Sequence, residues 1–411
     1  MVAVVRDLPV REAARALSAF DPMAALERVA LRDDPPALAL RGIAMAQLGE
    51  YPVARKLLRR AARAFGKDRP LSRARCVAAE AEIALVCRDL EAAGRGLTDA
   101  ADVLEAQGDR ANALFVRLQL VRRLVLLGRI DGARDALAAL SLDDAPPVLT
   151  ALGHLVAVDV ALRGLRPASA RRALARARQA ATRARVTALT AEVDRAARQL
   201  EQPVARLHRP DGPVPVGLDG VKSLVSSGDL LVDACRREVR CGPDVRSLVT
   251  RPVLFALAAA LAESAPGEAP RDQLVARAFG ARKANDSLRA RLRVELGRLR
   301  RVLEGLVEVG AAATGFRLVP AGTRRVVLLL PPAPGEASAL VALLEAGEAW
   351  STSALAAAVG LSQRSVQRAL TALLDQGRVQ SVGDGRSRRW TAPQASGFAT
   401  TLLLARTRGL G

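Results

Sequence analysis

Five polar residues between positions 363 and 371 have the side-chain types that read base pairs in duplex DNA: Gln363, Arg364, Gln367, Arg368 and Thr371. An arginine side chain can donate two hydrogen bonds to a guanine, and a glutamine side chain can bond an adenine in the same bidentate way. Such reading requires the side chains to project together from a helix that enters the major groove. The spacing meets this requirement, because apolar residues occupy the intervening positions at helical intervals.

A short apolar helix and a glycine turn precede these residues. Leu355, Ala358 and Val359 form the buried side of the first helix, and Gly360 allows the positive φ of a tight turn. Ser362 is placed to cap the second helix. The second helix is expected to bury its apolar residues, Val366, Leu370, Leu373 and Leu374. The pattern predicts a helix-turn-helix whose second helix carries the polar set on its outer face.

A basic hairpin is predicted after the second helix. Asp384 and Gly385 stand between two short β-like runs, and this dipeptide favours a two-residue turn between antiparallel strands. Trp390 is expected to close the hairpin onto the helices, while Trp350 begins the domain. Three basic side chains of the hairpin are placed to contact phosphate or the minor groove: Arg386, Arg388 and Arg389.

The segment from Gly335 to Pro393 resembles the winged-helix modules of MarR, IclR and GntR-type bacterial regulators. The resemblance implies binding to double-stranded DNA. Winged helices also serve as protein-docking modules, which is the alternative for this segment. The exposed face favours DNA, because it carries two glutamines and two arginines rather than a mixed acidic surface.

A second candidate module lies between Leu218 and Pro320, where the pattern predicts strands, three helices and a hairpin in that order. The third helix repeats leucines at intervals of four, four, three and four residues: Leu288, Leu292, Leu296, Leu299 and Leu303. Eight basic and two acidic residues from Arg282 to Arg301 give a local net charge of +6. Gly297 interrupts this helix at a cost of about 1 kcal/mol relative to alanine. It either permits close approach of another surface or is simply tolerated.

The end of this module, a Gly-Arg-Leu-Arg-Arg-Val-Leu run followed by a hairpin ending Gly315-Phe316-Arg317-Leu318, resembles the OmpR/PhoB-type winged helix. In that family an Arg-Leu-Arg recognition helix precedes a wing that closes on Gly-Tyr-Arg-Leu. Phe316 replaces the tyrosine and keeps its core role. The resemblance implies that five side chains approach DNA, the last of them on the wing: Ser287, Arg291, Arg298, Arg300 and Arg317. The alternative is a solvated basic helix on an ordinary packed domain.

The first 200 residues contain recurring helix-pair patterns rich in alanine, leucine and arginine. One pattern is similar to the tetratricopeptide repeat: Gly42, Leu48, Gly49, Tyr51, Ala54, Leu58 and Ala61. The small residue of each second helix recurs at separations of 39, 40 and 37 residues, as Ala54, Ala93, Ala133 and Ala170. Stacked helix pairs expose a concave groove, so the array is expected to bind a protein or peptide partner. A dimerisation platform or a spacer is the alternative.

Composition narrows the classes of partner. An aromatic content of 2% argues against readers of RNA or single-stranded nucleic acid, which stack bases on aromatic side chains. The formal net charge of +20 favours polyanions in general. Residues 1–200 hold 33 basic and 23 acidic side chains, and the remainder holds 29 and 19, so each part has a net charge of +10. Total charge therefore does not locate the interface.

The sequence predicts no enzyme activity, no cofactor and no metal site. It has no Walker A loop and no dinucleotide glycine fingerprint. Four irregularly spaced cysteines stand far from both histidines, His154 and His208. Arg6 and Asp7 interrupt the apolar N-terminus, which is unlike a signal peptide, and no apolar run approaches the roughly 18 residues that a membrane helix needs. We therefore expect a cytoplasmic protein that does not contact a membrane.

The expected fold class is mainly α, with an N-terminal α-helical repeat array followed by two winged helix-turn-helix domains with small β-hairpins. Proline-rich segments indicate the linkers. The expected divisions are tetratricopeptide-like repeats at 1–200, a linker at 201–217, an OmpR-like winged helix at 218–330, a linker at 331–335, a winged helix-turn-helix at 336–395 and a tail at 396–411.

These patterns favour a sequence-specific transcriptional regulator that binds double-stranded DNA, with the repeats acting as a sensor, docking or dimerisation platform. A protein–protein adaptor is the first alternative, in which the repeats and winged helices all bind protein partners. A non-specific nucleoid-type binder is the second, and its affinity would fall steeply with salt for every DNA sequence. The sequence leaves a homodimer open.

Overall fold

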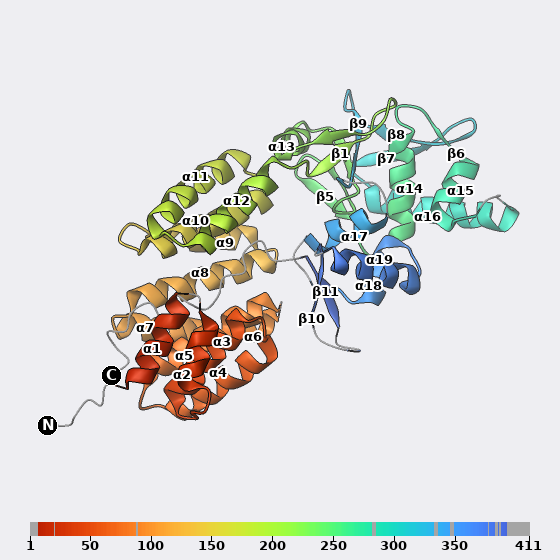
Figure 1. The fold of residues 1–411 in the computed structure, drawn as a ribbon. Coiled ribbons are helices and arrows are strands. Elements are labelled where there is room, and N and C mark those ends of the chain that lie inside the picture. Colours follow the sequence, from red (N-terminus) through yellow and green to blue (C-terminus); the bar gives the residue numbers. More distant parts are fainter. Residues whose placement is uncertain are drawn as a thin grey trace. The chain divides into compact units, whose positions relative to one another are not determined.

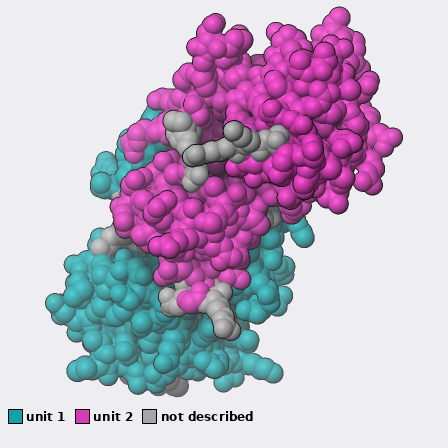
Figure 2. Space-filling view, turned by 90° about the vertical axis from the view of Figure 1, so that its right-hand side faces the viewer, with its two compact units in different colours: residues 1–164, 168–197, 394–411 teal, residues 165–167, 198–393 magenta. Residues whose placement is uncertain are grey.

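A computed structural model of the chain describes residues 7–19, 21–87, 89–281, 285–332, 336–345, 349–376, 378–382, 385 and 388–392. The fold is mainly helical with small sheets, as predicted. The chain forms two compact units (Figure 2). The first contains residues 1–164 and 168–197, and the second contains residues 165–167 and 198–393.

The first unit is built from helices, and successive helices pack against one another from the first to the tenth (Figure 1). They are α1 (Leu8–Ser18), α2 (Pro22–Val29), α3 (Pro35–Gln47), α4 (Tyr51–Phe65), α5 (Pro70–Val86), α6 (Leu90–Gly94), α7 (Leu97–Ala106), α8 (Arg110–Leu126), α9 (Ile130–Ala138), α10 (Pro147–Arg163), α11 (Pro167–Ala184) and α12 (Thr187–Glu201). Aspartate side chains accept a backbone N–H at the start of α1, α2, α6 and α8, which explains where these helices begin.

The recurring small residues of the predicted repeats are buried in the helices of the first unit. Each is 0% exposed: Ala54 in α4, Ala93 in α6, Ala133 in α9 and Ala170 in α11. Gly42 in α3 has a related role, because a Cβ there would lie 2.8 Å from the Cγ atom of Leu58 in α4. The spacing seen in the sequence therefore marks buried positions of these helices.

Arginines of the first unit form ion pairs between successive helices. Arg55 Nε of α4 lies 2.8 Å from Glu80 Oε1 of α5. Arg75 Nη2 of α5 lies 2.7 Å from Asp109 Oδ2, which also accepts a hydrogen bond from the Asn112 side chain at the start of α8. These charges are matched inside the array.

A six-stranded sheet, ordered β2-β1-β9-β3-β4-β5, opens the second unit. Its strands are β1 (Ala205–Leu207), β2 (Val214–Val216), β3 (Leu230–Asp233), β4 (Glu238–Cys241), β5 (Asp244–Ser247) and β9 (Val326–Leu330). β3 and β9 are parallel, and the other neighbours are antiparallel. Helix α13 (Leu218–Ser226) lies between β2 and β3 in the chain.

The prediction of a linker at 201–217 is wrong, because this segment supplies β1 and β2 to the sheet. Arg206 of β1 pairs with Leu330 of β9, and its Nε donates a hydrogen bond to the Pro331 carbonyl at 2.8 Å. The prolines suggested an irregular segment. One of them, Pro215, lies in β2, which is an edge strand, and edge strands tolerate a residue without an N–H group.

The three helices and the hairpin follow in the predicted order: α14 (Pro252–Glu263), β6 (Ala269–Pro270), α15 (Arg271–Phe279), α16 (Asp286–Leu303), β7 (Val307–Ala311) and β8 (Gly315–Pro320). The strands form a sheet ordered β6-β8-β7. The predicted leucine stripe of α16 faces the core, with Leu292, Leu296, Leu299 and Leu303 buried and Leu288 half-buried. A Cβ at Gly315 would lie 1.8 Å from the Ala269 carbonyl oxygen, so glycine permits the pairing of β6 with β8.

The last part of the second unit contains α17 (Glu336–Glu345), α18 (Thr352–Val359), α19 (Gln363–Asp375), β10 (Gln380–Val382) and β11 (Arg389–Thr391). Helix α18 packs against α14. Leu340, Leu355, Leu370 and Trp390 form the centre of a separate small core. Most of the predicted linker at 331–335 and the whole predicted tail at 396–411 lie outside the described residues.

Candidate functional site

Helices α18 and α19 are joined by a tight turn with a serine cap on each helix. Gly360 has a φ of +73°, in the left-handed region that favours glycine. Ser351 Oγ accepts the Ala354 N–H at 3.1 Å, and Ser362 Oγ accepts the Ser365 N–H at 3.1 Å. The predicted glycine turn and Ser362 cap are confirmed.

Helix α19 has one buried face and one polar face. Val366, Leu370 and Leu373 are at most 2% exposed. The prediction that Leu374 joins them is wrong, because Leu374 is 39% exposed. Consecutive helical residues differ by about 100° in direction, and Leu373 already fills the inward position. The exposed side chains include four predicted DNA readers: Gln363, Arg364, Arg368 and Thr371.

The two arginines of this face are available to a ligand. Within the described part of the chain, neither Arg364 nor Arg368 has an ion-pair or hydrogen-bonding partner for its side chain. The Thr371 hydroxyl donates a hydrogen bond to the Gln367 carbonyl at 3.0 Å, so its donor is used within the helix. The two guanidinium groups and the Gln363 amide are therefore the strongest candidates for contact with a partner.

The fifth predicted reader, Gln367, is half-buried. Its Oε1 accepts a hydrogen bond from the Thr352 hydroxyl at 3.3 Å, and the Thr352 oxygen in turn accepts one from Trp390 Nε1 at 3.0 Å. This chain of bonds joins α19, α18 and β11. The sequence did not signal it, because the three residues lie far apart along the chain and Thr352 looks like an ordinary first residue of a helix.

The hairpin strands β10 and β11 pair antiparallel, with Ser381 opposite Trp390. Trp390 is 1% exposed, and its backbone exchanges two hydrogen bonds with Trp350 at 2.8 and 2.9 Å, as expected for residues that close and open the domain. Arg389 is exposed, and the Arg388 guanidinium carbon lies 5.7 Å from the centre of the Trp390 ring. Two parts of the prediction, Asp384 in the turn and Arg386 as a DNA contact, lie outside the described residues.

The five side chains predicted to approach DNA from α16 and its hairpin differ in whether they already bond other parts of the protein. Arg298 Nη1 bonds Glu295 Oε1 at 2.8 Å, and Arg300 Nε donates to the Val309 carbonyl of β7 at 2.8 Å. The Arg291 guanidinium carbon lies 4.6 Å from the centre of the Phe279 ring. Ser287 on α16 and Arg317 on β8 are exposed. The structure therefore uses Arg300 to hold the hairpin against the helix.

An arginine outside both predicted sets connects the two parts of the second unit. Arg237, between β3 and β4, has a left-handed φ of +52°. Its Nη1 donates a hydrogen bond to the Ala358 carbonyl of α18, and its guanidinium carbon lies 5.2 Å from the centre of the Phe255 ring of α14. Burial lowers the pKa of Arg237 to about 10, so the group stays protonated at neutral pH. No local pattern in the sequence signals this contact.

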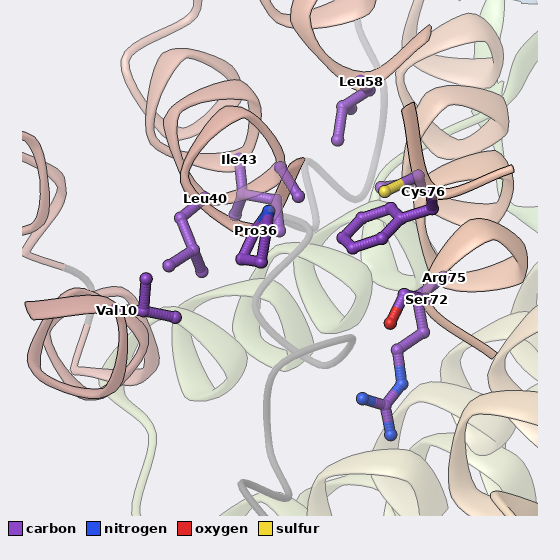
Figure 3. A pocket seen from close by; sticks show the side chains of 11 residues that line it. Val10, Pro36, Leu40, Ile43, Leu58, Ser72, Arg75 and Cys76 are labelled. Carbon is purple, nitrogen blue, oxygen red and sulfur yellow. The ribbon is translucent and has the colours of Figure 1, made fainter. Parts of the chain in front are cut away.

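The first unit contains a small apolar cavity of about 40 Å³ (Figure 3). Leu40, Ile43 and Leu58 contribute to its lining, together with Cys76, whose pKa burial raises to about 12. Arg75 also lines the cavity, but its guanidinium group is bonded to Asp109. Pockets for drug-sized ligands have volumes of about 300–1,000 Å³. We therefore interpret this cavity as a packing void.

A buried carboxyl group lies elsewhere in the repeats. Glu82 of α5 is 1% exposed, and neither of its carboxyl oxygens has a hydrogen-bond partner within the described ranges. Burial raises the pKa of Glu82 to about 8, and the positive charge of Arg122 partly opposes this shift. Burial therefore keeps this carboxyl group protonated up to a higher pH than an exposed glutamate, and its ionisation in the folded chain is costly.

No cluster of three or more His, Cys, Asp or Glu residues suited to a metal ion occurs among the residues that the structure describes. Over the same residues, no helix has the length and apolar character needed to cross a membrane. Comparisons of the chain with protein-family models, curated proteins and solved structures found no match.

Proposed function

We propose that this protein is a sequence-specific transcriptional regulator that binds double-stranded DNA in the cytoplasm. In this proposal, residues 218–330 and 336–395 are two winged helix-turn-helix modules, and α19 is the principal recognition helix. The observation that carries the proposal is the exposed polar face of α19, on which two arginines have no partner among the described residues.

The geometry of α19 supports base reading in three ways. Its start is fixed by the Ser362 cap, so the residues of its first turns have a defined orientation. Gln363 and Arg364 lie in the first turn, the part of a recognition helix that enters the major groove. The Trp390–Thr352–Gln367 hydrogen bonds hold the same helix against the hairpin, which presents Arg389 to solvent.

The module that contains α16 is proposed to contribute chiefly phosphate contacts. Arg298 is ion-paired and Arg300 bonds the hairpin backbone, so these two side chains are less free for base reading than the α19 arginines. Ser287, Arg291 and Arg317 remain on the surface. Phosphate contacts position a protein on DNA, whereas base contacts specify the sequence.

The helical repeats are proposed to receive a signal through a protein or peptide partner or to pair two copies of the chain. Several of their arginines are ion-paired between helices, as the Arg55–Glu80 and Arg75–Asp109 pairs illustrate. Such pairing makes these particular side chains less available to a phosphate group. We therefore assign DNA binding to the second unit.

Selection of bound duplexes from a random DNA pool tests the proposal. The full-length chain would be used at about 150 mM salt, where non-specific binding is already weakened. We expect enrichment of a defined motif. Uniform recovery of all sequences would instead indicate a non-specific charge-driven binder. Failure to retain any duplex would overturn the proposal and favour the adaptor, whose partners would then be sought by binding to the repeats.

A further inference from the structure

A basic hollow lies between α14 and α16 in the second unit. Its volume is about 560 Å³, and it is lined by the start of α14 and the C-terminal half of α16. The charged side chains of the lining are Arg251, Glu295, Arg298 and Arg301. The sequence pattern included Arg301 only as one of the basic residues of its helix and did not include Arg251, because the two residues lie far apart in the chain and meet only in the fold.

The hollow carries excess positive charge. Glu295 is engaged by Arg298 through a 2.8 Å ion pair, which leaves the charges of Arg251 and Arg301 unmatched in the lining. Among the described residues neither of these two side chains has an ion-pair partner. Two unmatched guanidinium groups facing one hollow favour an anionic ligand, and phosphate suits the planar donor pattern of arginine.

The start of α14 adds to this preference. The helix begins at Pro252 with Arg251 as its N-cap residue, and no side chain of the described chain accepts a hydrogen bond from its first turn. The unpaired N–H groups and the helix dipole at such a start attract anions. The arginines and the helix start act at the same place, because Arg251, Val253 and Leu254 all line the hollow.

The hollow also adjoins the turn that leads into α19. A Cβ on Gly360 would lie 3.8 Å from the Pro252 Cβ, and the Arg237 bond to Ala358 fixes the end of α18 next to α14. We propose that this hollow binds backbone phosphates of the same duplex whose bases α19 reads. This inference rests on the proposed function, and it assigns the Arg251 and Arg301 side chains to sequence-independent phosphate contacts.

Salt titration of DNA binding tests the assignment. Each phosphate contact with B-DNA contributes about 0.9 to the slope of log K against log salt. We expect Arg251→Ala/Arg301→Ala in the full chain to lower that slope by up to about 1.8, with equal loss of affinity for selected and unrelated duplexes. The enriched motif should stay the same. Arg251→Lys/Arg301→Lys keeps both charges and should restore most of the slope.

Arg209→Ala/Arg324→Ala is the matched control. Both residues are exposed, and they lie after β1 and before β9, at the opposite end of the six-stranded sheet from the Arg237 turn. This variant loses the same amount of positive charge. If total charge alone determined the salt dependence, its slope of log K against log salt would fall as much as that of Arg251→Ala/Arg301→Ala. An equal reduction, or an unchanged slope in Arg251→Ala/Arg301→Ala, would overturn the inference.

A second measurement separates DNA phosphates from free phosphate ligands. Thermal unfolding of the wild-type chain would be followed with inorganic phosphate and with ATP as probes. The inference expects no ATP-dependent rise in Tm at concentrations where the duplex binds. A rise that disappears in Arg251→Ala/Arg301→Ala would reassign the hollow to a nucleotide. If the wild-type chain fails to bind any duplex, the proposed function itself fails, which is distinct from an unchanged salt slope.

Discussion

The two units of the chain contain nearly equal excess charge but place it differently. Residues 1–200 and 201–411 each have a net charge of +10. In the repeats, arginines such as Arg55 and Arg75 bridge successive helices to carboxylates. In the second unit, Arg364 and Arg368 project from α19 with no ionic partner among the described residues. The α19 arginines therefore differ from these bridging arginines, because they lie unpaired among the described residues and together on one exposed helix face.

The largest expected effect comes from removing the unmatched charges of α19. Arg364→Ala/Arg368→Ala should weaken binding to a selected duplex by about 4 kcal/mol, close to a thousandfold in Kd, because each bidentate base contact contributes roughly 1–3 kcal/mol. The loss should be much smaller for unrelated duplexes. Equilibrium binding to both kinds of duplex measures the difference.

Arg69→Ala/Arg73→Ala is the charge-matched control in the repeats. Both side chains are exposed on or beside α5 and have no ion pair within the described residues. We expect a Kd within about twofold of the wild-type value, since the proposal assigns these side chains no DNA contact and exposed charges are screened at physiological salt. Equal losses in the two variants would abolish the distinction between the units.

The next effect concerns the one carboxyl group of the repeats that is buried without a partner in the described structure. The pKa of Glu82 is raised to about 8 by burial, above its ordinary value of 4.5. Between these pH values the folded chain binds more protons than the unfolded chain, so Glu82 lowers the free energy of unfolding as pH rises. Glu82→Gln removes this loss, and the variant should gain about 3 kcal/mol over wild type between pH 5 and 8.

Urea unfolding of the repeats by circular dichroism at several pH values measures this gain. Glu27→Gln is the control, because Glu27 lies exposed on α2. Its unfolding free energy should follow that of the wild type at every pH. Parallel curves for Glu82→Gln and wild type would show that Glu82 is ionised without penalty in the folded chain.

Features that depend on neighbouring residues were predictable from the sequence, whereas those that depend on distant residues were not. The Gly360 turn, the Ser362 cap and the buried stripe of α16 follow from local spacing and backbone preference. The pairing of β1 with β9 joins residues more than a hundred positions apart, and the prolines nearby obscured it. The Gln367 hydrogen bond to Thr352 also depends on tertiary packing, so the sequence pattern predicted that this side chain would be free to read DNA.

A moderate effect is expected from Arg237, which joins the two halves of the second unit. Arg237→Ala leaves the Ala358 carbonyl without its guanidinium donor, and loss of such a bond to a charged group costs about 2 kcal/mol. Both tryptophans of the chain, Trp350 and Trp390, lie in the affected part. Their fluorescence should therefore report unfolding at a lower urea concentration than in wild type.

Arg236→Ala controls for changes in the same turn, because the Arg236 side chain is exposed. Its tryptophan transition should coincide with that of the wild type. A shift of equal size in both variants would mean that the β3–β4 turn, rather than the bond to α18, determines the stability of this part.

The smallest effect tests the outer face of α16 against the outer face of α19. Apart from the neighbouring residues and backbone of its own helix, no atom of the described residues lies within 4 Å of the position that a Cβ would take at Gly297. Gly297→Ala should therefore stabilise the helix by about 1 kcal/mol, since alanine has the higher helix propensity. At Gly315 the added Cβ would overlap the Ala269 carbonyl, so Gly315→Ala should destabilise the same module.

Because the proposed phosphate contacts come from arginine side chains, DNA affinity should remain within about twofold for Gly297→Ala. Greater stability combined with a clear loss of affinity would instead show that the α16 backbone approaches the duplex at Gly297, giving this helix the same closeness to DNA that we propose for α19.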